Sequence, residues 1–254
     1  MQHIAMGIRE LLFGGGGGPS EGQIRRATKA ITEPHGDPAG RYSAADRLIQ
    51  WNTPDSLYAA LLRFTIQVPS LTIDQNEKEE LTRMLVQVGR PMVQPILKFL
   101  RLQTDIRWPC EILRQVVEAE EYLEHLLNVL LELKDKHIRD EEHKARLIQM
   151  LPKPGVSASR EVVTQYLENE NDEVVIAAIE FLTDGGGDEL REHLIRLLLQ
   201  AEGRPRVQAW VCEVFEERGW SVRPHTAEVE PVLPATFYLT SKGVVKRRSS
   251  AALE

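Results

Sequence analysis

Apolar residues recur at helical spacing through the middle of the chain, and residues 172–200 hold one complete helix–turn–helix unit. Asp172 and Asp188 are the predicted N-caps of its two helices, and the glycines at 185–187 are predicted to end the first one. Two short helices cannot bury both of their apolar stripes alone, so the unit predicts an array of neighbours. The two stripes consist of Val175, Ala178, Ile179 and Leu182, then of Leu190, Leu194, Leu197 and Leu198.

The same pattern recurs along the chain with a nearly constant period. Repeat starts fall at Arg41, Asp74, Ile106, Asp140, Asp172 and Arg204, so the gaps are 33, 32, 34, 32 and 32 residues. Seven residues after each start stand Leu48, Leu81, Leu113, Leu147, Ile179 and Val211, and ten residues after it stand Trp51, Met84, Val116, Met150, Leu182 and Val214. All twelve are apolar in a chain that is 42% hydrophobic, which favours a helical repeat over an irregular bundle.

The repeat predicts about six helix pairs between residues 41 and 219. Besides the unit at 172–200, the predicted pairs are 42–51 with 54–67, 75–88 with 91–103, 109–117 with 120–133, and 141–151 with 157–169. A sixth first helix is predicted at 206–218, ending at Gly219.

Two segments resemble a known repeat family. The run DEVVIAAIEFL at 172–182 resembles the first helix of a HEAT or HEAT-like repeat of the phycobilisome-lyase type, in which an acidic cap precedes a valine and an alanine-containing run. The run GRPMVQPILKFL at 89–100 resembles the turn and second helix of the same repeat. The resemblance implies an all-α fold in which residues 41–219 form an α-solenoid. It implies an architecture and no particular activity.

The flanking segments differ from the repeats. Residues 1–18 are predicted to form a short amphipathic helix and a glycine-rich flexible segment. This segment is either a frayed terminus or a helix docked on its own body, or else a tethered peptide that inserts into a partner's groove or onto a membrane surface. Residues 19–40 are predicted to hold a capping helix at 21–31 and a turn-rich connector. The predicted helix at the start carries Ile4, Ile8, Leu11 and Leu12 on one face.

The C-terminal part is predicted to close the array. Within residues 220–248, short β-rich runs at 236–240 and 244–246 flank a glycine turn and predict a small β-hairpin cap, with Trp220 and Phe237 as apolar cover. The basic residues of this tail are interpreted as a solvated terminus. They are Lys242, Lys246, Arg247 and Arg248. Residues 249–254 are interpreted as a vector scar.

Charge and composition narrow the function classes. The net charge of −7 argues against a nucleic-acid surface. The absence of a long apolar run or a secretion signal predicts a cytoplasmic protein. Cys110 and Cys212 lie about 100 residues apart, which fits two reduced core thiols. Residues 110–143 carry ten acidic and four basic residues, whereas residues 204–248 carry five acidic and eight basic residues. The array is therefore predicted to have an acidic middle and a mildly basic end.

The sequence predicts no catalytic residue, cofactor or metal. His125, His137 and His143 lack ligand spacing and are interpreted as surface residues. Ser157 and Ser159 follow a Pro-Gly turn and are interpreted as helix caps, and the chain has no Gly-x-Ser-x-Gly elbow.

The leading hypothesis is therefore a non-enzymatic scaffold that binds a protein or peptide on the concave face of the solenoid. Polar residues on the second helices form a candidate ladder there. The ladder consists of Lys98, Arg101, Asn128, Glu132, Gln165, Glu168, Glu192 and Arg196.

The alternative is an enzyme or enzyme subunit on the same fold, because HEAT-like families include DNA glycosylases and bilin lyases. A glycosylase would use aromatic residues on a basic concave face. Trp51, Trp108 and Trp210 are available, but Trp51 and Trp210 lie in core register and the acidic middle would repel phosphate.

Overall fold

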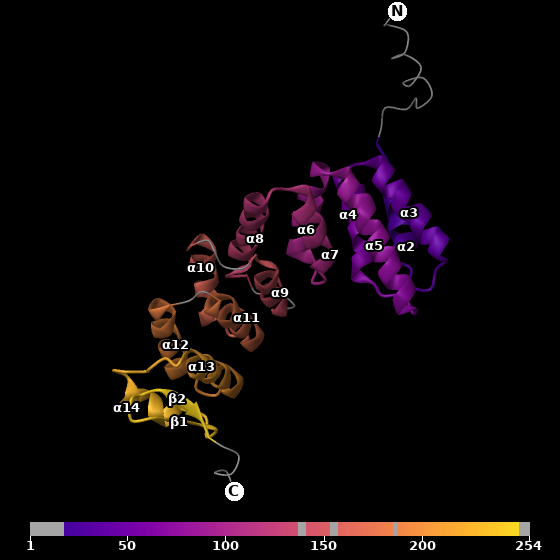
Figure 1. The fold of residues 1–254 in the computed structure, drawn as a ribbon. Coiled ribbons are helices and arrows are strands. Elements are labelled where there is room, and N and C mark those ends of the chain that lie inside the picture. The colour runs from indigo at the N-terminus through magenta and orange to yellow at the C-terminus, as the bar shows by residue number, and fades with distance from the viewer. Residues whose placement is uncertain (1–17, 137–140, 153–156, 185–186, 249–254) are drawn as a thin grey trace, which may run out of the picture. The chain divides into compact units, whose positions relative to one another are not determined.

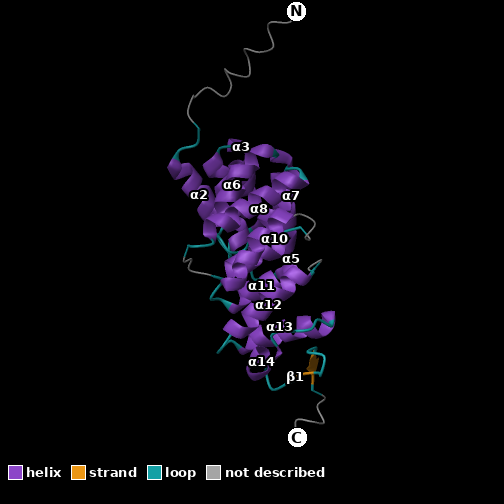
Figure 2. Ribbon diagram, turned by 90° about the vertical axis from the view of Figure 1, so that its left-hand side faces the viewer, coloured by secondary structure: helices purple, strands orange, loops and turns teal. Residues whose placement is uncertain are grey.

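A computed structural model describes residues 18–136, 141–152, 157–184 and 187–248 of the chain (Figure 1). The described residues are mostly helical, with one short antiparallel strand pair near the C-terminus (Figure 2). The chain divides into two compact units, residues 1–118 and 119–254. The predicted helix at 1–13 and the segment 249–254 lie outside the described residues.

The first unit is a set of helices that pack in two layers. Helix α5 packs on both α3 and α7, while α4 packs on α6 and on α2. The α-helices of this unit are α2 (Glu21–Ile31), α3 (Pro38–Trp51), α4 (Pro54–Leu61), α5 (Leu71–Val88), α6 (Val93–Leu102) and α7 (Arg107–Val116). Two 3-10 turns, η1 (Leu62–Thr65) and η2 (Arg90–Met92), continue α4 and precede α6.

Two helices of the first unit begin earlier than the sequence predicts. Helix α3 begins at Pro38, inside the predicted connector 32–40, because Asp37 accepts a hydrogen bond from the backbone N–H of Gly40 and caps it. Helix α5 begins at Leu71, because the Ser70 hydroxyl accepts from the N–H of Ile73. The predicted connector 32–40 therefore ends at Asp37, and the predicted helix start at Gln75 moves back to Leu71. Asp74 consequently lies inside the first turn of α5.

The second unit repeats the same pattern of packing. Helix α11 packs on both α9 and α13, and α10 packs on α8. The α-helices are α8 (Ala119–Leu133), α9 (Glu142–Met150), α10 (Ser157–Thr164), α11 (Asp172–Thr183), α12 (Asp188–Gln200), α13 (Pro205–Arg218) and α14 (Thr226–Val229). The 3-10 turns η3 (Gln165–Glu168) and η4 (Glu230–Val232) follow α10 and α14.

The cap of helix α11 is Asn171 and not the predicted Asp172. The Asn171 side chain accepts from the backbone N–H groups of Glu173 and Val174, at 2.9 and 3.3 Å. The carboxylate of Asp172 instead accepts from Nε of Arg204, at 2.7 Å. The residue at the start of one predicted repeat thus binds the residue at the start of the next, 32 positions later.

The predicted repeat positions differ in burial. The six residues at position seven of the repeat, from Leu48 to Val211, are all buried. At position ten, Leu182 and Val214 are buried, whereas Trp51, Met84, Val116 and Met150 are half-buried. Position seven therefore marks the core of each helix pair, and position ten lies at its margin in the first four.

Polar groups also join elements about one repeat apart. The Tyr166 hydroxyl donates to the carbonyl of Leu130 at 2.5 Å, and Nη1 of Arg204 donates to the carbonyl of Asn169 at 3.0 Å. The guanidinium of Arg218 donates to the carbonyl of Thr183. These contacts span 35 or 36 residues each, close to the predicted period.

The predicted C-terminal hairpin is confirmed. Strands β1 (Phe237–Leu239) and β2 (Val245–Arg247) pair antiparallel, with Phe237 opposite Arg247. Phe237 is buried, and the ring of Trp220 meets that of Phe215 edge-on at 5.7 Å. The basic tail is not simply solvated, because Arg247 pairs with Glu213 of α13.

Helix α13 ends as predicted at Gly219, which has a left-handed φ of 64°. A Cβ at this position would meet no atom within 4 Å, so backbone strain alone would act on a substitution. We expect Gly219→Ala to lower the free energy of unfolding by about 1 kcal/mol. Urea denaturation measures the change. The control Gly22→Ala lies inside α2 without a left-handed φ, the nearest atom to its added Cβ is 4.0 Å away, and it should not lower stability; equal losses in both variants would contradict the strain argument.

Candidate functional site

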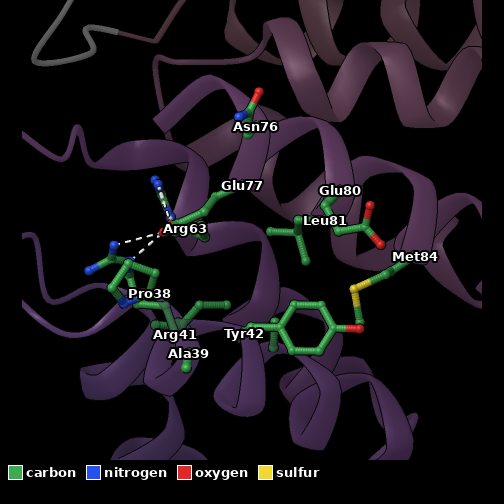
Figure 3. Close-up of a pocket in the computed structure, with 12 residues that line it drawn as sticks. Pro38, Ala39, Arg41, Tyr42, Arg63, Asn76, Glu77, Glu80, Leu81 and Met84 are labelled. Atoms are coloured by element: carbon green, nitrogen blue, oxygen red, sulfur yellow. Dashed lines mark hydrogen bonds and ion pairs between the residues drawn. The ribbon is translucent and has the colours of Figure 1, made fainter. Parts of the chain in front are cut away.

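The strongest candidate site is an apolar groove in the first unit. Its volume is about 330 Å³, and helices α2, α3 and α5 with the turn η1 line it (Figure 3). Leu81, Ala45 and Ile31 form buried parts of its wall, and Met84 is half-buried. Tyr42 also lines the groove with 55% of its surface exposed, so a large aromatic side chain is left open to solvent here.

One face each of α3 and α5 forms the long walls of the groove. The α3 wall consists of Pro38, Ala39, Arg41, Tyr42 and Ala45, and the α5 wall consists of Asn76, Glu77, Glu80, Leu81 and Met84. At 1.5 Å per residue, each wall is about 11–12 Å long. That length matches two turns of a helix.

A buried ionic cluster centred on Glu77 borders the groove, and Arg41, Arg63 and Glu77 are the members that line it. The guanidinium of Arg41, only 4% exposed, binds this carboxylate in two places, Nε to Oε2 at 2.9 Å and Nη2 to Oε1 at 2.7 Å. Nη1 of Arg41 also donates to the carbonyls of Glu33 and Gly36, at 3.1 and 2.5 Å. Such a bidentate pair fixes both the position and the plane of the guanidinium.

Arg63 is a second arginine on the same carboxylate. It is 2% exposed, and its Nε and Nη2 lie 3.2 and 2.9 Å from Oε2 of Glu77. Nη2 also donates to Oδ1 of Asp74 at 2.8 Å, and Nη1 donates to the carbonyl of Ile66 at 3.3 Å. Arg63 therefore connects the end of α4 to two carboxylates of α5.

Asp74 completes the cluster at its far side. Its Oδ2 lies 2.8 Å from Nζ of Lys78, and its Oδ1 accepts from the backbone N–H of Val68 at 3.1 Å. Three cations and two carboxylates thus form one cluster across α3, η1 and α5, and its members are Arg41, Arg63, Asp74, Glu77 and Lys78.

The cluster keeps its carboxyl groups charged. Burial by itself raises the pKa of Glu77, but the hydrogen bonds from Arg41 and Arg63 outweigh it, so the pKa lies below its ordinary value of 4.5. Burial likewise opposes ionisation of Asp74, yet hydrogen bonds from Lys78, Arg63 and the Val68 N–H hold its pKa below 3.8. The pKa of Arg41 is raised, chiefly by its hydrogen bond to Glu77.

These lowered pKa values predict a loss of stability in acid. A carboxyl group whose pKa is lowered by folding stabilises the fold above its ordinary pKa and loses that contribution as the pH falls through the folded value. For Glu77 and Asp74, the loss begins below about pH 4.5 and 3.8. The slope of stability against pH that Glu77 contributes is at most about 1.4 kcal/mol per pH unit.

Thermal unfolding between pH 3 and pH 7 tests this dependence. We expect Glu77→Gln to lower the melting temperature at pH 7 and to flatten its decline below pH 4.5. Glu79→Gln changes an exposed carboxylate on the same helix and should keep the wild-type slope. A Glu77→Gln profile parallel to the wild type would contradict the assignment.

The predicted ladder residues do not line this groove. None of the eight is among the described residues that form its walls. In the first unit, Lys98 and Arg101 lie on α6; Nζ of Lys98 is 3.6 Å from Asp55 and 4.6 Å from the ring centroid of Tyr58. The exposed amine of Lys98 is thus already engaged by neighbouring α4.

The other six ladder residues lie in the second unit. Asn128 and Glu132 are exposed on α8, and Glu168 is exposed at the end of η3. Of the other three, Gln165 accepts from Lys134 at 2.9 Å, Glu192 pairs with Arg191 at 3.0 Å, and Arg196 lies 3.1 Å from Nδ1 of His193. Glu192 also lies 3.8 Å from Nε2 of His225, so Gln165 and Glu192 both contact residues outside their own helices.

Other predicted residues are placed as follows. Neither Cys110 nor Cys212 is in a disulfide and both are buried, as predicted, and burial raises the pKa of the Cys212 thiol to about 12. His143 is buried, so the surface prediction is wrong for it, while His137 lies outside the described residues. Ser157 begins α10, and Ser159 is buried within it instead of capping it.

The tryptophans named for a glycosylase-like site do not gather in the groove. Trp108 stacks on Phe64 with centroids 6.1 Å apart, and Trp51 and Trp210 are half-buried on α3 and α13. Within the described ranges, no group of three or more histidine, cysteine or acidic residues is arranged to hold a metal ion.

The sequence analysis missed the ionic cluster, although a signal was present. Arg41 and Asp74 were used only as repeat starts, and Arg63 and Lys78 were not singled out. The buried face of α5 runs through Asp74, Lys78, Leu81 and Leu85. Two charged residues in register with an apolar stripe indicate buried ion pairs, because such residues are rarely buried unless they are paired.

Comparison with known proteins adds no family assignment. No protein-family model matches the sequence, and no curated protein and no solved structure is significantly similar to it. Among the residues that the structure describes, no helix has both the length and the apolar character needed to cross a membrane.

Proposed function

We propose that this chain is a non-enzymatic scaffold that binds an amphipathic helix of a partner protein in the groove between α3 and α5. The observation that carries the proposal is the open apolar groove with Tyr42 exposed on its wall. Apolar grooves of this kind take up helices through side chains at i and i+4. The groove walls, about 11–12 Å long, offer room for two such side chains.

The packing of the helices supports the scaffold part of the proposal. In each unit, a helix packs on the second helix before it and the second helix after it, as α5 does on α3 and α7, and α11 on α9 and α13. Such layering is what stacked helix pairs produce. We therefore propose a solenoid of HEAT-like pairs as the architecture.

The ionic cluster supports the binding part. Arg41 and Arg63 line the groove and are held by several hydrogen bonds each, so this part of its surface is rigid before any partner arrives. A preformed surface binds with a smaller loss of conformational entropy than one that must be ordered. The cluster thus acts by holding α3 and α5 at a fixed spacing.

We separately propose that the predicted ladder on the second helices of the pairs is a second surface that binds a partner protein. Its exposed members, such as Asn128 and Glu168, remain available to a partner. We also propose a cytoplasmic location, because both cysteines are buried and neither is in a disulfide.

A displayed library of random 15-residue peptides tests the groove without knowledge of the natural partner. The library is selected on the full chain, and the enriched peptides are then measured against Tyr42→Asp. We expect apolar residues at i and i+4 in the enriched peptides and at least about a tenfold loss of affinity with Tyr42→Asp, which places a charge in the apolar contact.

Two further variants make this test specific. Tyr238→Asp changes another exposed tyrosine, on β1, and should leave peptide binding unchanged. Lys98→Glu with Arg101→Glu tests the ladder in the first unit. If binding survives Tyr42→Asp but is lost in the Lys98 and Arg101 variant, the groove is excluded as the site and the ladder takes its place.

A further inference from the structure

We infer that the groove between α3 and α5 is occupied, in the absence of a partner, by the chain's own N-terminal segment, residues 4–12. This inference rests on the proposed function in one respect, because both treat the groove as a surface for apolar helices. It adds a regulatory contact to that function: a partner must displace the chain's own segment.

The first argument is the match between segment and groove. Ile4, Ile8, Leu11 and Leu12 are spaced for one face of a helix. From Ile4 to Leu12, a helix would be about 12 Å long, the same as the groove walls. A cavity of about 150 Å³ accepts a benzene ring, so the 330 Å³ groove can hold two of these aliphatic side chains.

The second argument is reach. A Cβ added at Gly18 would lie 3.7 Å from Cγ2 of Thr53, so the chain enters the first unit beside the end of α3. Tyr42 lies nine residues before Trp51, which is about 14 Å back along α3. The six steps from Leu12 to Gly18 span up to about 20 Å when extended.

The third argument is the effect of tethering. Five glycines, 14–18, join the apolar segment to α2, and a short tether of this composition gives an effective concentration of about 1 mM. A segment whose own affinity for the groove is only about 0.2 mM would then fill it in roughly five chains of six.

Thiol labelling of the full chain tests the inference. Ala39 lines the groove and is exposed, so Ala39→Cys places a reactive thiol there. The native thiols do not compete, because Cys110 and Cys212 are buried. The labelling rate is compared with that of the same chain carrying I8D, L11D and L12D, which removes the apolar stripe of the segment.

We expect the A39C thiol to react about sixfold more slowly in the chain with the native segment, because the groove is open in roughly one chain of six. Ser43→Cys, on the same helix, is exposed and outside the groove lining, and should react equally in both backgrounds. Circular dichroism checks that each variant keeps its helices. Equal A39C rates in the two backgrounds would overturn the inference.

Dilution and the peptide experiment separate the remaining outcomes. Protection that is constant over a hundredfold dilution supports occupation by the same chain, whereas protection lost on dilution identifies a second copy and overturns the inference. If selected peptides depend on Tyr42 but A39C is unprotected, only this inference fails. If A39C is protected but no peptide depends on Tyr42, the proposed partner site fails and the internal contact stands.

Discussion

Replacing Glu77 with alanine is expected to lower the free energy of unfolding by about 3–5 kcal/mol, because it leaves two buried arginines without their shared carboxylate. Arg41 and Arg63 together make four hydrogen bonds to this side chain. Both guanidinium groups are almost fully shielded from water in the folded protein, so water from the groove replaces the lost carboxylate only in part. Breaking one side of a buried ion pair is much more destabilising than losing a pair at the surface.

Urea denaturation followed by circular dichroism measures this effect, and hydrogen exchange of α3 and α5 assigns it to the first unit. The matched control is Glu79→Ala, two residues along the same helix, where an exposed carboxylate accepts only from Gln75 at 2.7 Å. It should change stability by less than about 0.5 kcal/mol. A Glu77→Ala loss below about 1 kcal/mol would show that the arginines find other partners.

Replacing Phe215 with alanine is expected to lower the free energy of unfolding by about 3–5 kcal/mol in the second unit. The side chain is 0% exposed, and its ring meets that of Trp220 at 5.7 Å with an interplanar angle of 81°. The substitution removes a large buried ring and also the edge-to-face contact, which adds about 0.5–1.5 kcal/mol to the loss. The segment that follows α13 thereby loses the contact of its Trp220 ring with that helix.

Urea denaturation measures the change in stability, and fluorescence reports on the four tryptophans, of which Trp220 loses its ring contact. We expect the emission to shift to longer wavelength at urea concentrations where the wild type is still folded. Tyr238→Ala removes an aromatic ring that is 39% exposed on β1 and should lower stability by less than about 1 kcal/mol. Equal losses in the two variants would contradict a specific role for the Phe215–Trp220 contact.

The positions of most helices could be predicted from the sequence because apolar periodicity is a local property. Leu48, Leu81 and Ile179 lie at the same place in three predicted repeats, and all three are buried. The helix starts were harder to predict. Aspartate, asparagine and serine are nearly equal as caps, so nothing in the sequence distinguishes Asn171 from Asp172, although the two have different roles in the fold.

The candidate site could be predicted much less well, because it depends on contacts between helices. The Arg41–Glu77 pair joins residues 36 positions apart, and its formation requires the register of α3 against α5. The predicted ladder was chosen from the pattern of the second helices alone, and in the structure Lys98 is already engaged by Asp55 and Tyr58. Periodicity therefore indicated which residues are buried, but not which polar side chains meet.

The polar contacts between successive helix pairs have a consequence for synthesis of the protein. Arg41 binds Glu77, Tyr166 binds Leu130, and Arg204 binds Asp172, so in each case the partners are separated by only 32 to 36 positions. A chain growing on the ribosome can close each of these bonds as soon as the next hairpin has emerged, without waiting for its C-terminus. Vectorial assembly of this kind keeps little apolar surface uncovered at any moment, which lowers the risk of aggregation during translation.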